Sequence, residues 1–117
     1  WTMTSVTLYH NPRYSKSRQT LALLEENNVD LNTIEYLKNP LNADQIKAVA
    51  EKLGVPVRDI TRTGEAEYKE QLLDDASDDQ LAEAIAATPI LMQRPIVVHG
   101  STARIGRPPE SVLEILG

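Results

Sequence analysis

The first 37 residues predict a strand, a helix and a second strand in direct succession. A β-prone run at 6–9 is followed by helix formers over 17–27 and by an alternating run over 31–37. Leu21 and Leu24 have the three-residue spacing of one apolar helix stripe. A strand–helix–strand unit of this length predicts two parallel strands joined by a right-handed crossover.

The C-terminal part of the chain predicts two more strands and a last helix. The runs 96–98 and 103–105 are β-prone and are separated by a turn, which is typical of an antiparallel hairpin. Two prolines then introduce a helix expected over 110–116, with Val112, Leu113 and Leu116 on its buried side. Parallel strands at the start and antiparallel strands at the end together favour an α/β fold with a mixed four-stranded sheet covered by helices.

The segment between these halves, roughly 40–88, is expected to be helical. Asn42 with Gln45, and Ser77 with Gln80, have the spacing of capping boxes at two helix starts. Gly54 suits the end of the first of these helices. No repeat or linker divides the 117 residues, so a single domain, 1–117, with a helical insertion is expected.

Composition excludes several functions. The net charge of −5 argues against nucleic-acid binding. No apolar run approaches the ~20 residues of a membrane span, and the N-terminus lacks the pattern of a signal peptide, so no membrane partner and a cytoplasmic location are expected. The absence of cysteine excludes disulfides and thiol catalysis by this chain, and no histidine spacing indicates a metal site.

The loop before the first helix is the first candidate binding site. Arg13, Lys16 and Arg18 lie within six residues without an acidic neighbour, and Ser15 and Ser17 add hydroxyl groups. A loop that follows a strand and leads into a helix N-terminus favours an anion. Ser17 and Arg18 are therefore interpreted as oxyanion-binding residues. The alternative is that these cations are ordinary surface residues.

A second basic cluster consists of Arg94, Arg104 and Arg107. No acidic residue stands between the first and the last of them. Arginine suits bidentate binding of a tetrahedral oxyanion, although each of these residues alone is equally compatible with a surface ion pair. The run from Glu65 to Glu83 holds eight acidic residues against one lysine, and it is interpreted as a solvated helical face.

Several of these residues together resemble a known family. Residues 9–18 read Tyr-His-Asn-Pro-Arg-Tyr-Ser-Lys-Ser-Arg. They resemble the Tyr-x-x-Pro-x-Cys-x-x-Ser-Arg motif of the glutaredoxin-dependent arsenate reductase family, which includes the Spx and YffB-like proteins. The run 94–98 resembles a second family motif, Arg107-Pro108 a third, and Arg62 matches a further family arginine. The similarity extends over 6–116 in the same order.

The resemblance implies a thioredoxin-like fold with a helical insertion and a cis bond between Arg94 and Pro95. It implies that a nucleophilic cysteine attacks arsenate, and that this position is Tyr14 here. It implies that His10 lies beside the nucleophile, and that the oxyanion is held by Arg62, Arg94 and Arg107. Arsenate or a similar oxyanion is then the substrate, glutathione the co-substrate and glutaredoxin the partner. No bound cofactor and a monomer are expected.

Tyr14 departs from the motif at its most important position. A phenol with a pKa of ~10 is only about 0.1% ionised at pH 7, and an aryloxide cannot pass through a disulfide. The chain with Tyr14 is therefore expected to be inactive, with arsenate reduction belonging to a cysteine-containing form. The alternatives are a non-catalytic oxyanion-binding protein, an Spx-like regulator, and a glutathione-dependent thiol reductase. Spx-type proteins carry Cys-x-x-Cys in this loop, whereas this chain has Tyr14 and Ser17.

Overall fold

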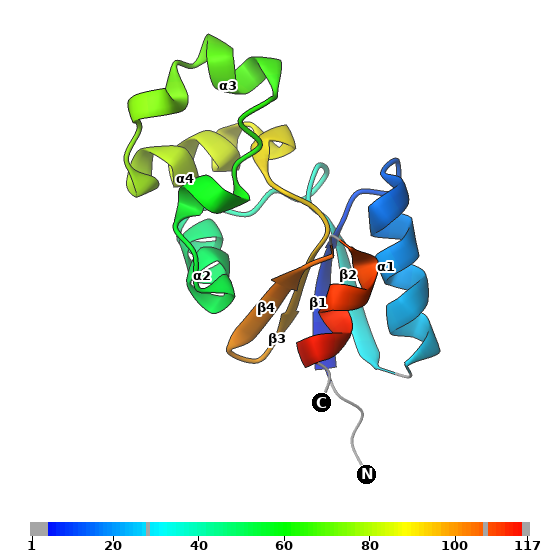
Figure 1. The fold of residues 1–117 in the computed structure, drawn as a ribbon. Helices are drawn as coiled ribbons and strands as arrows, with labels where there is room; N and C mark the ends of the chain where they lie inside the picture. The colour runs from blue at the N-terminus through cyan, green and yellow to red at the C-terminus, as the bar shows by residue number, and fades with distance from the viewer. Residues whose placement is uncertain (1–4, 28, 107, 116–117) are drawn as a thin grey trace. The chain divides into compact units, whose positions relative to one another are not determined.

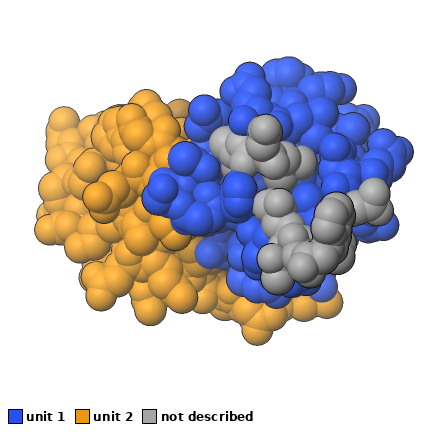
Figure 2. All heavy atoms as spheres, turned by 90° about the horizontal axis from the view of Figure 1, so that it is seen from below, with its two compact units in different colours: residues 1–36, 94–117 blue, residues 37–93 orange. Residues whose placement is uncertain are grey.

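The computed structural model describes residues 5–27, 29–106 and 108–115. The chain divides into two compact units, coloured separately in Figure 2. The sheet unit comprises 1–36 and 94–117, and the helical unit comprises 37–93. The helical unit occupies the part of the sequence where an insertion over about 40–88 is predicted. That the whole chain folds as a single domain stays a prediction.

A four-stranded mixed sheet organises the sheet unit (Figure 1). Its strands are β1 (Ser5–His10), β2 (Asp30–Glu35), β3 (Ile96–His99) and β4 (Thr102–Ile105), in the order β2-β1-β3-β4. β1 and β2 are parallel, whereas β3 runs antiparallel to both β1 and β4. The predicted parallel first pair and the C-terminal hairpin are confirmed. β1 is central, so its carboxyl end meets elements from both ends of the chain.

Two helices cover one face of this sheet and enclose its core. α1 (Ser15–Glu26) and the 3₁₀ helix η4 (Pro109–Ile115) contact each other, as Figure 1 shows. Alternation along β1 directs Val6 and Leu8 to this face. They pack with Leu24 of α1, Val97 of β3 and Val112 of η4. The core therefore fixes α1 against the strand that leads into it.

The last helix differs from the expectation. It is a 3₁₀ helix over Pro109–Ile115 rather than an α-helix over 110–116. Three residues per turn place Pro109 and Val112 on one buried side, whereas the next residue, Leu113, faces solvent with 37% exposure. The prediction that Leu113 is buried was wrong for this reason. Leu116 lies outside the described residues.

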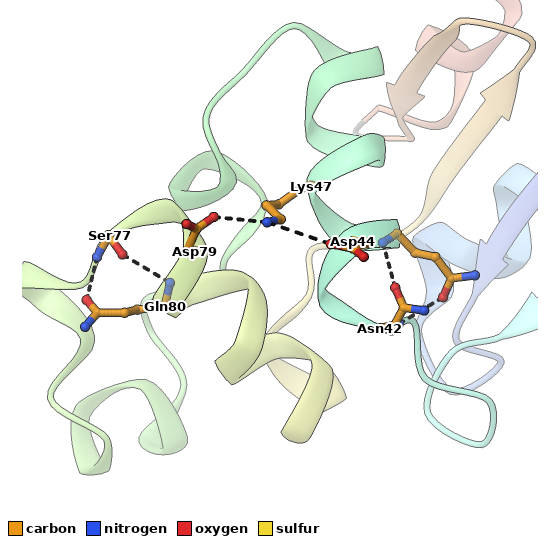
Figure 3. Close-up of polar contacts among 7 residues, drawn as sticks. Asn42, Asp44, Lys47, Ser77, Asp79 and Gln80 are labelled. Atoms are coloured by element: carbon orange, nitrogen blue, oxygen red, sulfur yellow. Dashed lines mark hydrogen bonds and ion pairs between the residues drawn. The ribbon is translucent and has the colours of Figure 1, made fainter.

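The helical unit contains three α-helices and three 3₁₀ turns. They are α2 (Ala43–Leu53), η1 (Val57–Ile60), α3 (Ala66–Glu70), η2 (Leu73–Asp75), α4 (Asp78–Ala87) and η3 (Pro89–Leu91). Both predicted capping boxes are present (Figure 3). Gln45 N–H donates to Asn42 Oδ1 at 2.8 Å, and Gln80 N–H donates to Ser77 Oγ at 3.2 Å. Gly54, with φ of 75°, ends α2 in the left-handed conformation.

α2 and α4 pack together to form the core of the helical unit. The buried side chains on these two helices are Ile46, Val49, Ala50, Leu81, Ala82 and Ile85. Lys47 connects the helices on the outside, with Nζ 3.1 Å from Asp79 Oδ1 (Figure 3). Within the part of the chain that the structure describes, no helix is both long enough and apolar enough to cross a membrane.

Candidate functional site

The candidate site begins where β1 ends and the chain turns into α1. Residues 11–14 form a tight turn in which Tyr14 N–H donates to the Asn11 carbonyl at 3.0 Å. Tyr14 is the N-cap residue of α1, and its side chain does not cap the helix. No acidic residue occupies the first turn of α1. The positive end of the α1 dipole therefore lies at Tyr14, in surroundings that favour an anion.

Ser17 fixes the conformation of this turn from inside the molecule. Its side chain is fully buried, and its Oγ lies 2.7 Å from His10 Nδ1. The same oxygen accepts the Asn11 N–H at 3.0 Å. Arg18 closes the turn from outside, because its Nη1 donates to the Pro12 carbonyl at 2.9 Å. The predicted roles of Ser17 and Arg18 as oxyanion ligands stay predictions, since in this structure their polar atoms hold the loop.

His10 is 6% exposed and lies at the carboxyl end of β1. Burial lowers the pKa of its imidazole below the ordinary value; Glu35 opposes this change and Arg18 adds to it. Because Ser17 Oγ can donate to a neutral Nδ1, the contact with Ser17 suits the uncharged ring. His10 is thus a buried residue that supports the loop next to Tyr14 through its contact with Ser17.

Lowering the pH is expected to destabilise the protein partly through His10. A lowered pKa in the folded state means that the unfolded chain binds a proton more readily. The contribution of His10 to stability is therefore fully present above the unfolded pKa of ~6.5, and it is lost as the pH falls from that value through the lower folded pKa. Urea unfolding at pH 7.5 and 5.5 should show a smaller pH-dependent loss in His10→Gln than in the parent chain. His99→Gln is the control, and an equal loss in both variants would contradict the assignment to His10.

Arg94 reaches the loop from the other end of the sequence. It immediately precedes β3, and the antiparallel register pairs Ile96 with Tyr9, so the chain enters β3 at the carboxyl end of β1. The Arg94–Pro95 peptide bond is cis. Arg94 is 8% exposed, and its Cζ lies 4.0 Å from the centre of the Tyr14 ring. This cation–π contact places a buried positive charge over the Tyr14 ring.

Arg62 belongs to the helical unit and is fixed there by its backbone. Its N–H donates to the Leu91 carbonyl, and Gln93 N–H donates to the Ile60 carbonyl at 2.8 Å. The segment 91–93, which forms these hydrogen bonds with residues 60–62, directly precedes Arg94 in the chain. The Arg62 side chain forms an ion pair with Glu65.

The other basic residues have different environments. Arg104 lies on β4 and pairs with Glu114 Oε2 of η4 at 3.2 Å. Arg13 and Lys16 are exposed on the loop and on the first turn of α1. Arg107 lies outside the described residues, and its predicted role in oxyanion binding stays a prediction. Among the described residues, no group of three or more potential metal ligands gathers.

The fold is thioredoxin-like. Its sheet has the order β2-β1-β3-β4, and the candidate loop connects β1 to α1. A model of the ArsC family matches residues 9–115. "Arsenate reductase" from Haemophilus influenzae is 46% identical over 115 residues, covering 96% of this chain and 99% of that protein. "Uncharacterized protein YfgD" from Escherichia coli is 48% identical, covering 96% and 97%.

The solved structure "Arsenate reductase from Vibrio cholerae" superposes with a TM-score of 0.95 at 47% identity, covering 98% of this chain and all of that one. The chain belongs to the ArsC family. This family and the thioredoxin-like fold were both predicted from the sequence motifs, and both are confirmed. This ArsC family chain contains no cysteine, and the assignment of Tyr14 to the position of the family nucleophile stays a prediction.

Proposed function

We propose that this chain has the site of a glutaredoxin-dependent arsenate reductase and lacks only the nucleophile. In a cysteine-containing form it reduces arsenate to arsenite, with glutathione as co-substrate and glutaredoxin as partner. The Tyr14 chain binds the oxyanion without turning it over. The observation that most supports this proposal is the buried Arg94 guanidinium, which covers the Tyr14 ring at the start of α1.

The proposed roles follow from the chemistry of each group. A guanidinium binds a tetrahedral oxyanion through its N–H groups, and the Arg94 guanidinium lies over the Tyr14 ring. Arg94 is therefore the proposed oxyanion ligand beside Tyr14. Arg62 and Arg107 supply further guanidinium groups, as in the resembling family, and no resident metal or cofactor takes part. The protein acts as a monomer.

In the proposed reduction of arsenate to arsenite, two thiol groups supply the two electrons. Arsenate gains two electrons and loses one oxygen as water, while two thiol groups become one disulfide. A tyrosine oxygen can form an ester with arsenate but cannot become part of that disulfide. A non-catalytic oxyanion-binding protein is the second candidate function, and the absence of any cysteine favours it for this chain.

Arsenate binding tests the part of the proposal that applies to the Tyr14 chain. Calorimetric titration is expected to give a dissociation constant of about 1 mM or tighter, with no arsenite formed when glutathione and glutaredoxin are present. Arg94→Ala is expected to weaken binding about 10-fold, because a charge-assisted hydrogen bond contributes roughly 1.5–3 kcal/mol. Arg104→Ala removes the same charge outside the proposed site and should change little. Equal affinity in Arg94→Ala and the parent would contradict the proposal.

A further inference from the structure

We propose that Glu65 is an internal competitor for the oxyanion. Its carboxylate holds the guanidinium of Arg62 when the site is empty and must release it when the anion binds. The inference rests on the proposed role of Arg62 as an oxyanion ligand, and it adds a residue that sets the affinity of that site.

The Arg62–Glu65 pair is more enclosed than the pairs of Lys47 with Asp79 and of Arg104 with Glu114. The two side chains are 24% and 23% exposed. In the pair of Lys47 with Asp79 the exposed fractions are 42% and 79%, and in the pair of Arg104 with Glu114 they are 42% and 66%. Exposed ion pairs contribute little because water and salt screen them, whereas partly buried pairs are screened much less. Glu65 therefore restrains Arg62 more strongly than an exposed carboxylate would.

The backbone around Glu65 brings its carboxylate back toward Arg62. Glu65 N–H donates to the Arg62 carbonyl at 3.2 Å, which closes a turn over residues 62–65. Glu65 is also the N-cap residue of α3. Here the side chain makes no capping hydrogen bond. The carboxylate pairs with the arginine instead of capping the helix.

A carboxylate and a tetrahedral oxyanion use the same donors of a guanidinium. Both accept the paired N–H groups of arginine in a bidentate arrangement. The backbone N–H of Arg62 is fixed by its hydrogen bond to the Leu91 carbonyl, so its side chain is the part that can exchange one acceptor for the other. Arsenate carries a negative charge and can displace Glu65. Arsenous acid is uncharged near neutral pH and cannot compete with it, so the return of Glu65 to Arg62 favours release of the product.

Calorimetric titration of arsenate into a set of variants tests this proposal. Glu65→Gln keeps the side-chain shape and removes the charge, and it is expected to tighten binding about 3–10-fold. Glu70→Gln removes the same charge from an exposed position at the end of α3 and should change affinity less than about 2-fold. Glu65→Asp, which draws the carboxylate back by one methylene, should tighten binding less than Glu65→Gln. It provides a second measurement if Glu65→Gln folds poorly.

A double-mutant cycle separates direct competition from a general structural effect. Glu65→Gln should lose its effect when Arg62 is already alanine. An effect of Glu65→Gln equal to that of Glu70→Gln, or one that persists in the Arg62→Ala background, would overturn the inference alone. If Arg62→Ala binds arsenate as tightly as the parent chain, the proposed role of Arg62 is overturned as well. In the Tyr14→Cys background, the expected change is a lower KM for arsenate.

Discussion

Gly106→Ala is expected to destabilise the protein by about 3 kcal/mol, a large part of the roughly 5–15 kcal/mol that stabilises a typical domain. A Cβ atom at this position would lie 2.5 Å from Thr20 Oγ1 and 2.7 Å from Pro95 Cγ. Neither atom can move easily. Thr20 is fully buried with its hydroxyl bonded to the Lys16 carbonyl, and the proline atom belongs to a rigid ring.

Urea unfolding of matched glycine variants measures this effect. Gly64→Ala is the control, since a Cβ there meets nothing within 4 Å. Because Pro95 follows Arg94 and Thr20 lies on α1, Gly106→Ala should also weaken arsenate binding in the folded fraction. Unfolding of Gly106→Ala at the same urea concentration as Gly64→Ala would show that the close approach has no energetic importance.

The sequence predicts those parts of the fold that depend on neighbouring residues. The capping boxes at Asn42 and Ser77 are confirmed because each needs only a partner three residues away. The strands were predicted to within a few residues for the same reason, since their alternation is local. The last helix was assigned the wrong period, because prolines and apolar residues at its start do not distinguish a 3₁₀ helix from an α-helix.

The site could be predicted only in part, because its contacts join distant residues. The motif identifies Tyr14 and Arg94 separately, but the cation–π contact between them depends on β3 pairing with β1. Ser17 was interpreted as a donor to the oxyanion, and this role stays a prediction, because the structure shows its hydroxyl only in contact with His10 and the loop backbone. The three-residue spacing of Arg62 and Glu65 is visible in the sequence. Nothing there indicates that Glu65, among eight nearby carboxylates, is the one that pairs.

Tyr14→Cys is expected to convert an inactive chain into an arsenate reductase. A thiol is much smaller than a phenol ring, so the replacement opens the space beside Arg94 that the ring occupies. The N-terminus of α1 and the cations of the loop are surroundings that lower the pKa of a thiol and make the thiolate available near neutral pH. Loss of a nucleophile reduces turnover by up to about 10⁶-fold in other enzymes, so a gain of at least about 100-fold is expected here.

Two variants separate the chemistry of sulfur from simple enlargement of the site. Tyr14→Ser opens the same space without supplying a thiol, and it should remain at background because an oxygen ester cannot be resolved through a disulfide. Ser15→Cys supplies a thiol one residue further along, on an exposed side chain, and should also remain at background. Arg94→Ala in the Tyr14→Cys background should lose most of the gain, because the oxyanion is then held less firmly.

Arsenite formation by Tyr14→Cys, with arsenate, glutathione and glutaredoxin supplied, tests most directly whether this chain is a reductase that lacks only its nucleophile. The proposal predicts at least about 100-fold more arsenite than the Tyr14, Tyr14→Ser and Ser15→Cys chains form under the same conditions. A Tyr14→Cys protein that unfolds at the same urea concentration as the parent, and still forms no more arsenite than these controls, would contradict it.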